Sequence, residues 1–129
     1  GYPEWQTYTK DHLEAFFELD TYFYSSFYTN NLLPAAINFT KNYRRWYGKE
    51  MDERYPKFGM LGFDTGYFFL KGLARYGSSF EKNMQGLDLI PIQTGFKFQR
   101  VNNWGGFINK KVFFVHFTKN FELVKLDFD

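Results

Sequence analysis

The chain has 129 residues, of which 24% are aromatic and 23% charged, and its 16 basic and 14 acidic side chains leave a formal net charge of +2. So many rings beside an ordinary charged fraction exclude a disordered chain. A net charge near zero gives no chain-wide electrostatic footprint for nucleic acid or an anionic membrane. No run of about 18 apolar residues is present, so no membrane-spanning helix is expected. The length fits one domain.

The first quarter of the chain predicts short elements. Residues 1–7 are typical of a strand end or loop, and apolar spacing predicts a helix over 10–19. Residues 21–28 are aromatic without a polar side, which favours an extended segment covered on both faces. A turn is expected at 29–31.

Two longer helices are predicted in the middle of the chain. Pro34 suits the first turn of one helix, and Gly48 is its C-terminal stop. The other helix runs from about residue 59 to 76 and ends at Gly77.

The helix over 59–76 is expected to bury the apolar residues that recur every three or four positions. These are Phe63, Tyr67, Leu70 and Ala74. Three glycines also lie inside this helix, and each lowers the stability of the helix by about 1 kcal/mol relative to alanine. Such glycines usually permit close approach of another segment or a ligand. They are Gly62, Gly66 and Gly72.

The last third predicts a short helix and then strands. Ser78 and Glu81 are spaced as a capping box. Residues 93–101 alternate as a strand, and 112–117 and 121–128 predict two strands joined by a hairpin turn. The expected fold class is therefore α/β, with helices in the first two thirds and an antiparallel hairpin system at the C-terminus.

The residues available for catalysis are few. Cysteine is absent, which excludes disulfides and thiolate chemistry. His12 is expected to be solvated, and His116 to be a partly buried, hydrogen-bonded ring. General acid–base and metal sites need a second placed partner, and no nucleotide, metal or hydrolase motif is present. We therefore expect no enzyme, cofactor or metal, and we interpret the charged residues 49–54 as a solvated connector.

Binding is better represented than catalysis. Glu4 lies between Tyr2 and Trp5, where it could hold an ammonium group by an ion pair and cation–π contacts. Trp104 lies in a glycine- and asparagine-rich loop; it either contacts a ligand or folds back on its own hairpin. Asp64 lies in the apolar start of the helix over 59–76. It is either a first-turn acid favoured by the helix dipole or a group that faces a ligand.

Four segments follow one another in an order that resembles a known family. They are Gly1-Tyr2-Pro3-Glu4, then Tyr22-Phe23-Tyr24-Ser25-Ser26-Phe27, then Phe39 to Gly48 with Tyr55 to Gly66, and finally Gln93 to Phe98 with Asn109 and Val112 to Phe117. The order resembles the C-terminal part of type 1 periplasmic ligand-binding proteins, the branched-chain amino-acid receptors of ABC transporters. In detail it is similar to the receptor-like domains of LysM-containing envelope proteins of Bacteroidetes.

The resemblance implies a two-lobed fold of parallel sheets in which residues 22–27 form a crossover between lobes. It places Glu4 at the ligand's amino group and Phe58 against the ligand's side chain. Where the family has Tyr-Asp-Ala, this chain has Phe63-Asp64-Thr65, which puts amino-acid specificity in doubt. We expect residues 1–129 to be a single unit, the C-terminal segment of a larger protein of the periplasm or cell envelope. Exposed apolar faces should make it self-associate.

Three functions remain open from the sequence. The first is a non-catalytic solute-binding or sensing module for an amino acid or a peptidoglycan fragment, with ligand contacts at Glu4, Trp5, Phe58, Asp64 and Trp104. The second is a structural or protein-interaction domain derived from the receptor fold. The third is carbohydrate binding through exposed rings such as Trp5, Tyr8 or Trp104.

Overall fold

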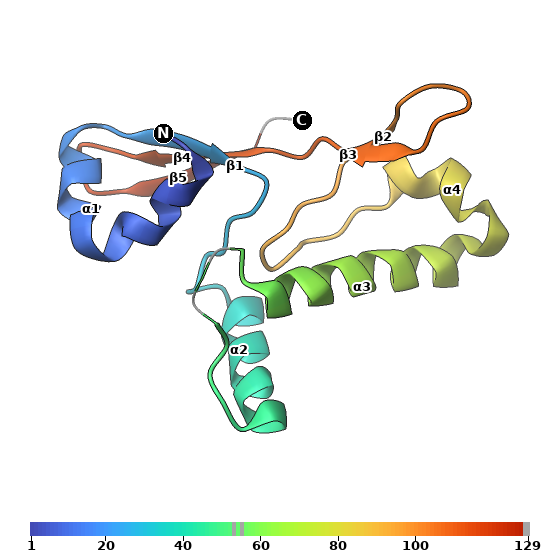
Figure 1. Cartoon of the computed structure of the whole chain (residues 1–129), viewed down its shortest axis with the longest axis horizontal. Helices are drawn as coiled ribbons and strands as arrows, with labels where there is room; N and C mark the ends of the chain where they lie inside the picture. Colours follow the sequence, from blue (N-terminus) through green and yellow to red (C-terminus); the bar gives the residue numbers. More distant parts are fainter. Residues whose placement is uncertain (53, 55, 128–129) are drawn as a thin grey trace. The chain divides into compact units, whose positions relative to one another are not determined.

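The computed structural model describes residues 1–52, 54 and 56–127 (Figure 1). The described chain contains both helices and antiparallel strands, so the predicted mixed class is confirmed. Three expectations lie outside the described residues, those for Glu53, Tyr55 and Phe128. The elements are η1 Pro3–Tyr8, α1 Thr9–Glu18, β1 Tyr22–Ser25, α2 Pro34–Tyr47, α3 Phe58–Tyr76, η2 Gly77–Ser79, α4 Phe80–Asn83, η3 Met84–Gly86, β2 Phe98–Arg100, β3 Phe107–Asn109, β4 Phe113–Phe117 and β5 Leu123–Asp127.

The chain divides into two compact units. Unit 1 is built from the two ends of the chain, residues 1–28 and the segment from Val112 onward. Unit 2 is the continuous stretch from Thr29 to Lys111. The first unit therefore depends on contacts between segments that are far apart in sequence.

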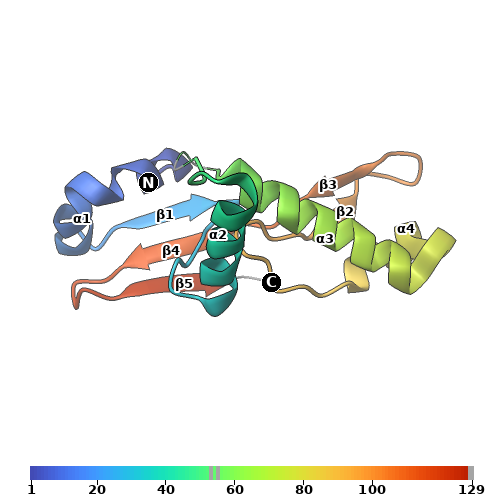
Figure 2. The same cartoon turned by 90° about the horizontal axis from the view of Figure 1, so that it is seen from below.

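Unit 1 is a three-stranded antiparallel sheet in the order β1-β4-β5, with α1 on one face (Figure 2). Phe16 of α1 packs on Phe23, Val115 and Phe117 of the sheet. The hairpin of β4 and β5 confirms the predicted C-terminal pair of strands. Residues 1–7 do not form a strand end: Pro3 opens a 3-10 helix, whose first turn suits its fixed backbone angle.

Strand β1 differs from its prediction. Phe23 and Ser25 are buried, whereas Tyr22 and Tyr24 between them are exposed. A strand points successive side chains to opposite faces, so this alternation means that one face of the sheet is covered and the other open. The continuous aromatic run indicated cover on both faces because tyrosine counts as apolar although its hydroxyl tolerates water.

Unit 2 contains the two long helices, and both end where glycine predicts. Gly48 takes a φ of +65° after α2, the left-handed conformation that glycine adopts at little cost, and Gly77 follows α3. One cluster joins α2 to α3 through Ala36, Met51, Met60 and Ile92. A second lies farther along α3, around Phe68, Phe80 and Leu87.

The predicted buried stripe of α3 is wrong. Phe63, Tyr67, Leu70 and Ala74 are exposed, and the buried positions are Met60, Asp64, Phe68 and Gly72. Of the three glycines predicted to permit close approach, Gly62 and Gly66 face open space and Gly72 lies beside the ring of Phe80. The apolar residues of α3 surround the helix, and periodicity could not select the buried side.

The end of the helical region also departs from the capping-box prediction. Ser78 lies in the 3-10 turn η2, and the carboxylate of Glu81 pairs with the guanidinium of Arg100 on strand β2. The short helix itself is present as α4. The ion pair ties α4 to the β2–β3 hairpin within unit 2.

Candidate functional site

Glu4 and Trp5 lie in the 3-10 helix η1 of unit 1. The Glu4 side chain is exposed. The indole of Trp5 stacks on Phe16, with ring centroids 5.9 Å apart and planes 8° from parallel. One face of Trp5 therefore belongs to the edge of the unit 1 core, and Glu4 beside it is open to an approaching cation.

Phe58 is the first residue of α3, and its side chain is 67% exposed. The backbone next to it is held by Gln93, which is fully buried. The amide oxygen of Gln93 accepts the Lys57 N–H at 2.9 Å, and its Nε2 donates to the Lys57 carbonyl at 3.1 Å. Phe58 thus starts from a firmly placed backbone but contributes little to the core.

Asp64 has neither of its two expected roles. Its side chain is only 2% exposed, and its carboxylate accepts three backbone N–H groups. Oδ1 accepts from Ile92 at 2.8 Å, and Oδ2 accepts from Gln93 at 2.8 Å and Thr94 at 2.9 Å. The carboxylate is therefore a structural anchor within unit 2, and it does not face a ligand.

Asp64 and Gln93 together fasten the segment 92–94 to the first half of α3, and we call this arrangement the α3 clamp. Because the amides of Ile92, Gln93 and Thr94 point at Asp64, they are not available for a strand ladder. Strand β2 accordingly begins at Phe98 rather than at residue 93. Thr94 Oγ1 is buried beside the clamp and has no hydrogen-bond partner among the described residues.

Trp104 is at the tip of the β2–β3 hairpin, and its side chain is 98% exposed. Asn102 shapes the loop, since its Oδ1 accepts the Trp104 N–H at 2.9 Å. The alternative in which the indole folds back on its own hairpin is therefore wrong. Both of its faces are open to solvent.

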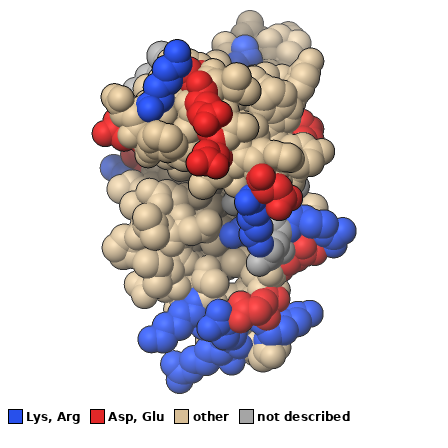
Figure 3. All heavy atoms as spheres, turned by 90° about the vertical axis from the view of Figure 1, so that its left-hand side faces the viewer, with Lys and Arg blue, Asp and Glu red and all other residues tan. Residues whose placement is uncertain are grey.

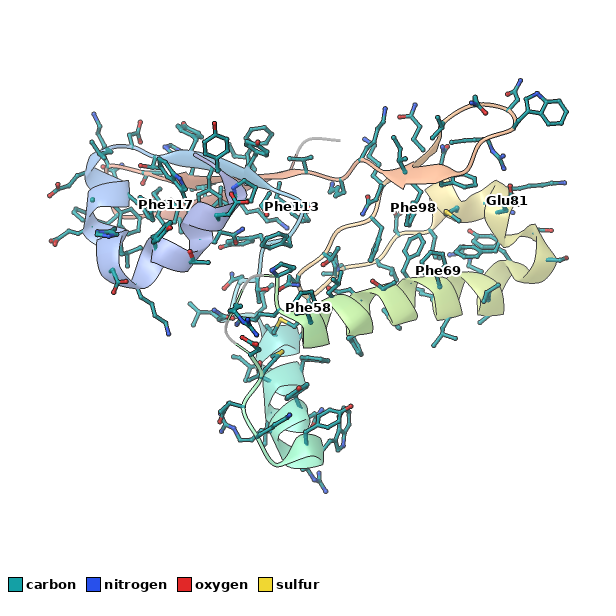
Figure 4. The ribbon with its side chains drawn as sticks, viewed as in Figure 1. Phe58, Phe69, Glu81, Phe98, Phe113 and Phe117 are labelled. Atoms are coloured by element: carbon teal, nitrogen blue, oxygen red, sulfur yellow. The ribbon has the colours of Figure 1, made fainter. Side chains whose placement is uncertain are left out.

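The structure does not bring the candidates of unit 2 together. Phe58 is at the start of α3, whereas the hairpin that carries Trp104 packs against the other half of this helix (Figure 4). The packing runs through Phe98, whose ring centroid lies 5.3 Å from Phe68 and 6.0 Å from Phe69. Asp64 lies between these ends but is enclosed. Glu4 and Trp5 belong to unit 1.

A second pair of polar groups, which the sequence patterns did not reveal, lies in unit 1. His116 Nε2 is 2.7 Å from Asp20 Oδ1, and the His116 ring stacks on Tyr22 at 3.8 Å. His116 is partly buried and hydrogen-bonded, as predicted, and His12 is exposed, as predicted. In the described part of the chain, no three His, Asp or Glu side chains gather to hold a metal ion.

The charged residues of the connector after α2 are exposed where they are described, as predicted, but Met51 among them is buried in the cluster that joins α2 to α3. Hydrogen bonds from the Arg54 side chain, and then from its backbone N–H, lower the pKa of the exposed Asp52 to about 2. The side-chain hydrogen bond to Asp52, and then the negative charge of Asp52, raise the pKa of Arg54. Water screens an exposed pair of this kind, so the pair stabilises the fold little.

Comparison with known proteins adds no relative. No protein-family model matches the chain, and neither a curated protein nor a solved structure matches it significantly. None of the helices in the described residues is long and apolar enough to cross a membrane.

Proposed function

We propose that the chain is the C-terminal part of a two-lobed solute-binding or sensing module of the bacterial envelope, without catalysis. The observation that carries this proposal is the way the chain divides. The boundary between the units follows Tyr28, directly behind the segment 22–27 that the family resemblance makes a crossover between lobes. The chain returns to unit 1 at Val112, where the closing strand begins.

The composition of the units supports the same proposal. A C-terminal piece of such a protein supplies mainly helices to one lobe and strands to the other. Unit 2 holds α2, α3 and α4, and unit 1 holds the three-stranded sheet. The β2–β3 hairpin, which the resemblance groups with the closing strands, stays in unit 2 and is a departure from this pattern.

Ligand binding predicts a rise in thermal stability of the full-length protein. Amino acids, peptidoglycan fragments and neutral glycans would each be added while the unfolding midpoint is recorded. A ligand at one hundred times its dissociation constant stabilises the native state by about 2.7 kcal/mol. For a ligand with an amino group, Glu4→Gln should reduce the shift, whereas Glu14→Gln on exposed α1 should leave it intact. No shift with any of these solutes would contradict solute binding.

A scaffold that lacks a ligand site is the second candidate, and Asp64 favours it. Asp64 is the more enclosed of the two carboxylates among the predicted ligand groups, and it accepts hydrogen bonds from three backbone amides of the same chain. Phe58 and Trp104, at separate places in unit 2, then serve as contacts with other proteins. Rings dominate the energetics of such interfaces.

Self-association of the 129-residue chain is a further expectation of both candidates. The exposed side of α3 carries Phe63, Tyr67, Leu70 and Leu73. A contiguous apolar surface of this kind favours pairing with a second copy. Light scattering should give a mass above that of a monomer, and Leu70→Glu should lower it. Ile90→Glu, at an exposed apolar residue away from α3, should not, and a monomeric parent chain would contradict the expectation.

A further inference from the structure

The last turns of α2 and the residue after Gly48 carry cations and aromatic rings together. We define the α2 tip as Lys41, Arg45, Trp46, Tyr47 and Lys49. Earlier rings of the same helix, Phe39 and Tyr43, pack against the core of unit 2. The tip extends beyond this contact, away from α3 (Figure 1).

The rings of the tip are open to solvent. The side chain of Trp46 is 68% exposed and that of Tyr47 is 63% exposed. Burial of an aromatic ring is among the larger contributions to folding, so two exposed rings in one helical turn do little for the stability of unit 2. Their position is better suited to contact with something outside the chain.

The cations of the tip have no ion-pair partner among the described residues. Arg44 is used within the chain, since its Nε lies 2.5 Å from Glu50 Oε1. Within the described ranges, Lys41, Arg45 and Lys49 are exposed and form no ion pair. Figure 3 shows blue side chains gathered over this end of the molecule. The small net charge of the whole chain conceals the cluster because most acidic residues lie in other segments, and the neighbouring Glu50 is paired with Arg44.

The helix dipole explains part of this pattern. Cations in the last turn of a helix are stabilised by the carbonyl groups there, which accounts for Arg44 and Arg45. The dipole does not account for Trp46 and Tyr47, nor for Lys49 beyond the helix. The combination of rings and cations therefore favours a role in contact with an external partner.

We propose that the α2 tip binds the headgroup layer of an anionic membrane. Trp and Tyr favour the depth of lipid headgroups, where the ring meets the apolar boundary and its polar atom meets water. Lys and Arg beside them are attracted to the negative surface. A projecting helix end also meets a flat surface more readily than it encloses a strand. Nucleic acid is less suited, because its binding sites follow the backbone with a longer basic track.

Flotation with lipid vesicles tests this proposal, because bound protein rises with the vesicles while aggregates sink. At low salt, the 129-residue chain should float with vesicles of phosphatidylglycerol and phosphatidylcholine, and not with phosphatidylcholine alone. Arg45→Gln with Lys49→Gln should weaken the partition about thirtyfold, since two cations near an anionic surface are removed. Lys82→Gln with Lys119→Gln lowers the net charge equally, at exposed sites on other elements than α2, and should leave the partition unchanged.

The indole supplies a second measurement. The tryptophan emission should shift to shorter wavelength on vesicle binding, and Trp46→Phe should remove this shift while Trp104→Phe retains it. The proposal fails if the parent chain does not float with anionic vesicles. It also fails if both pairs of lysine and arginine variants weaken binding equally, or if the chain binds single-stranded nucleic acid and not the vesicles.

Discussion

Replacement of Asp64 by alanine is expected to lower the free energy of unfolding of unit 2 by about 4 kcal/mol. The change leaves the N–H groups of Ile92, Gln93 and Thr94 without their acceptor in a buried site. Each buried donor without a partner costs about 1–3 kcal/mol, and water entering the vacated space recovers part of this. Urea unfolding of the variant and the parent chain measures the difference.

Two further variants isolate the role of the carboxylate. Asp64→Asn preserves size but replaces one acceptor oxygen by a donor, so it should lose at least one of the three hydrogen bonds. Its free energy of unfolding should lie between those of the Asp64→Ala variant and the parent chain. Asp88→Ala removes an exposed carboxylate from the neighbouring segment and should change stability by less than about 0.5 kcal/mol. Equal stability of the Asp64→Ala and Asp88→Ala variants would contradict the clamp.

Rescue by a small anion is the most specific consequence of the clamp. Converging backbone N–H groups form a concave anion site, and in the native chain Asp64 fills it. Formate should therefore raise the unfolding midpoint of the Asp64→Ala variant by binding where the carboxylate was. The parent chain should respond less, because its site is occupied.

The α3 clamp could not be predicted from the sequence. Asp64 was identified as unusual because it interrupts an apolar helix start. Its partners are 28 to 30 residues away, in a segment that alternates like a strand. No nearby residue in the sequence indicates that the backbone N–H groups of Ile92 to Thr94 point toward a helix. A buried acid without a nearby cation could have suggested backbone donors, but it could not have located them.

Features set by short-range chemistry were predicted well. Pro34 and Gly48 bound α2 because a fixed φ suits the first turn and a left-handed φ ends the last one. The β4–β5 hairpin follows from two apolar runs and the turn between them. The prediction of the buried side of α3 was wrong because apolar rings occur all round the helix. The side that is buried is the one on which Phe80, Leu87 and Phe96 pack against Phe68.

Among the candidate site residues, the sequence predicted exposure better than assembly. Trp104 and Phe58 are exposed, as residues that meet a ligand should be. Whether such residues converge depends on how distant segments pack, and in unit 2 they do not. The α2 tip was overlooked because net charge was judged over the whole chain, whereas a surface is recognised over one or two helical turns.

Glycine-to-alanine substitutions in α3 should have opposite effects at two positions. At Gly72, an added Cβ would lie 2.5 Å from Cζ and 2.6 Å from Cδ2 of Phe80, and closer to Cε2. Phe80 is itself held against Phe68 and Phe69, so the ring cannot move without disturbing the second core cluster. Overpacking of this kind costs about 1–3 kcal/mol. Since alanine regains up to about 1 kcal/mol of helix propensity, we expect a net loss of about 1 kcal/mol.

At Gly66, nothing lies within 4 Å of the added Cβ, and the same substitution should stabilise the chain by about 0.5–1 kcal/mol. The two variants make the same substitution inside the same helix, so the difference in their unfolding free energies reports mainly on the contact with Phe80. The free energy of unfolding of the double variant, Gly72→Ala with Phe80→Leu, tests whether the clash with the Phe80 ring causes the loss. A smaller, flexible side chain should accommodate the methyl group and recover part of the loss. If Gly72→Ala were instead as stable as Gly66→Ala, then α3 would not pack on α4 through this face, and the assignment of Met60, Asp64, Phe68 and Gly72 as its buried side would be wrong.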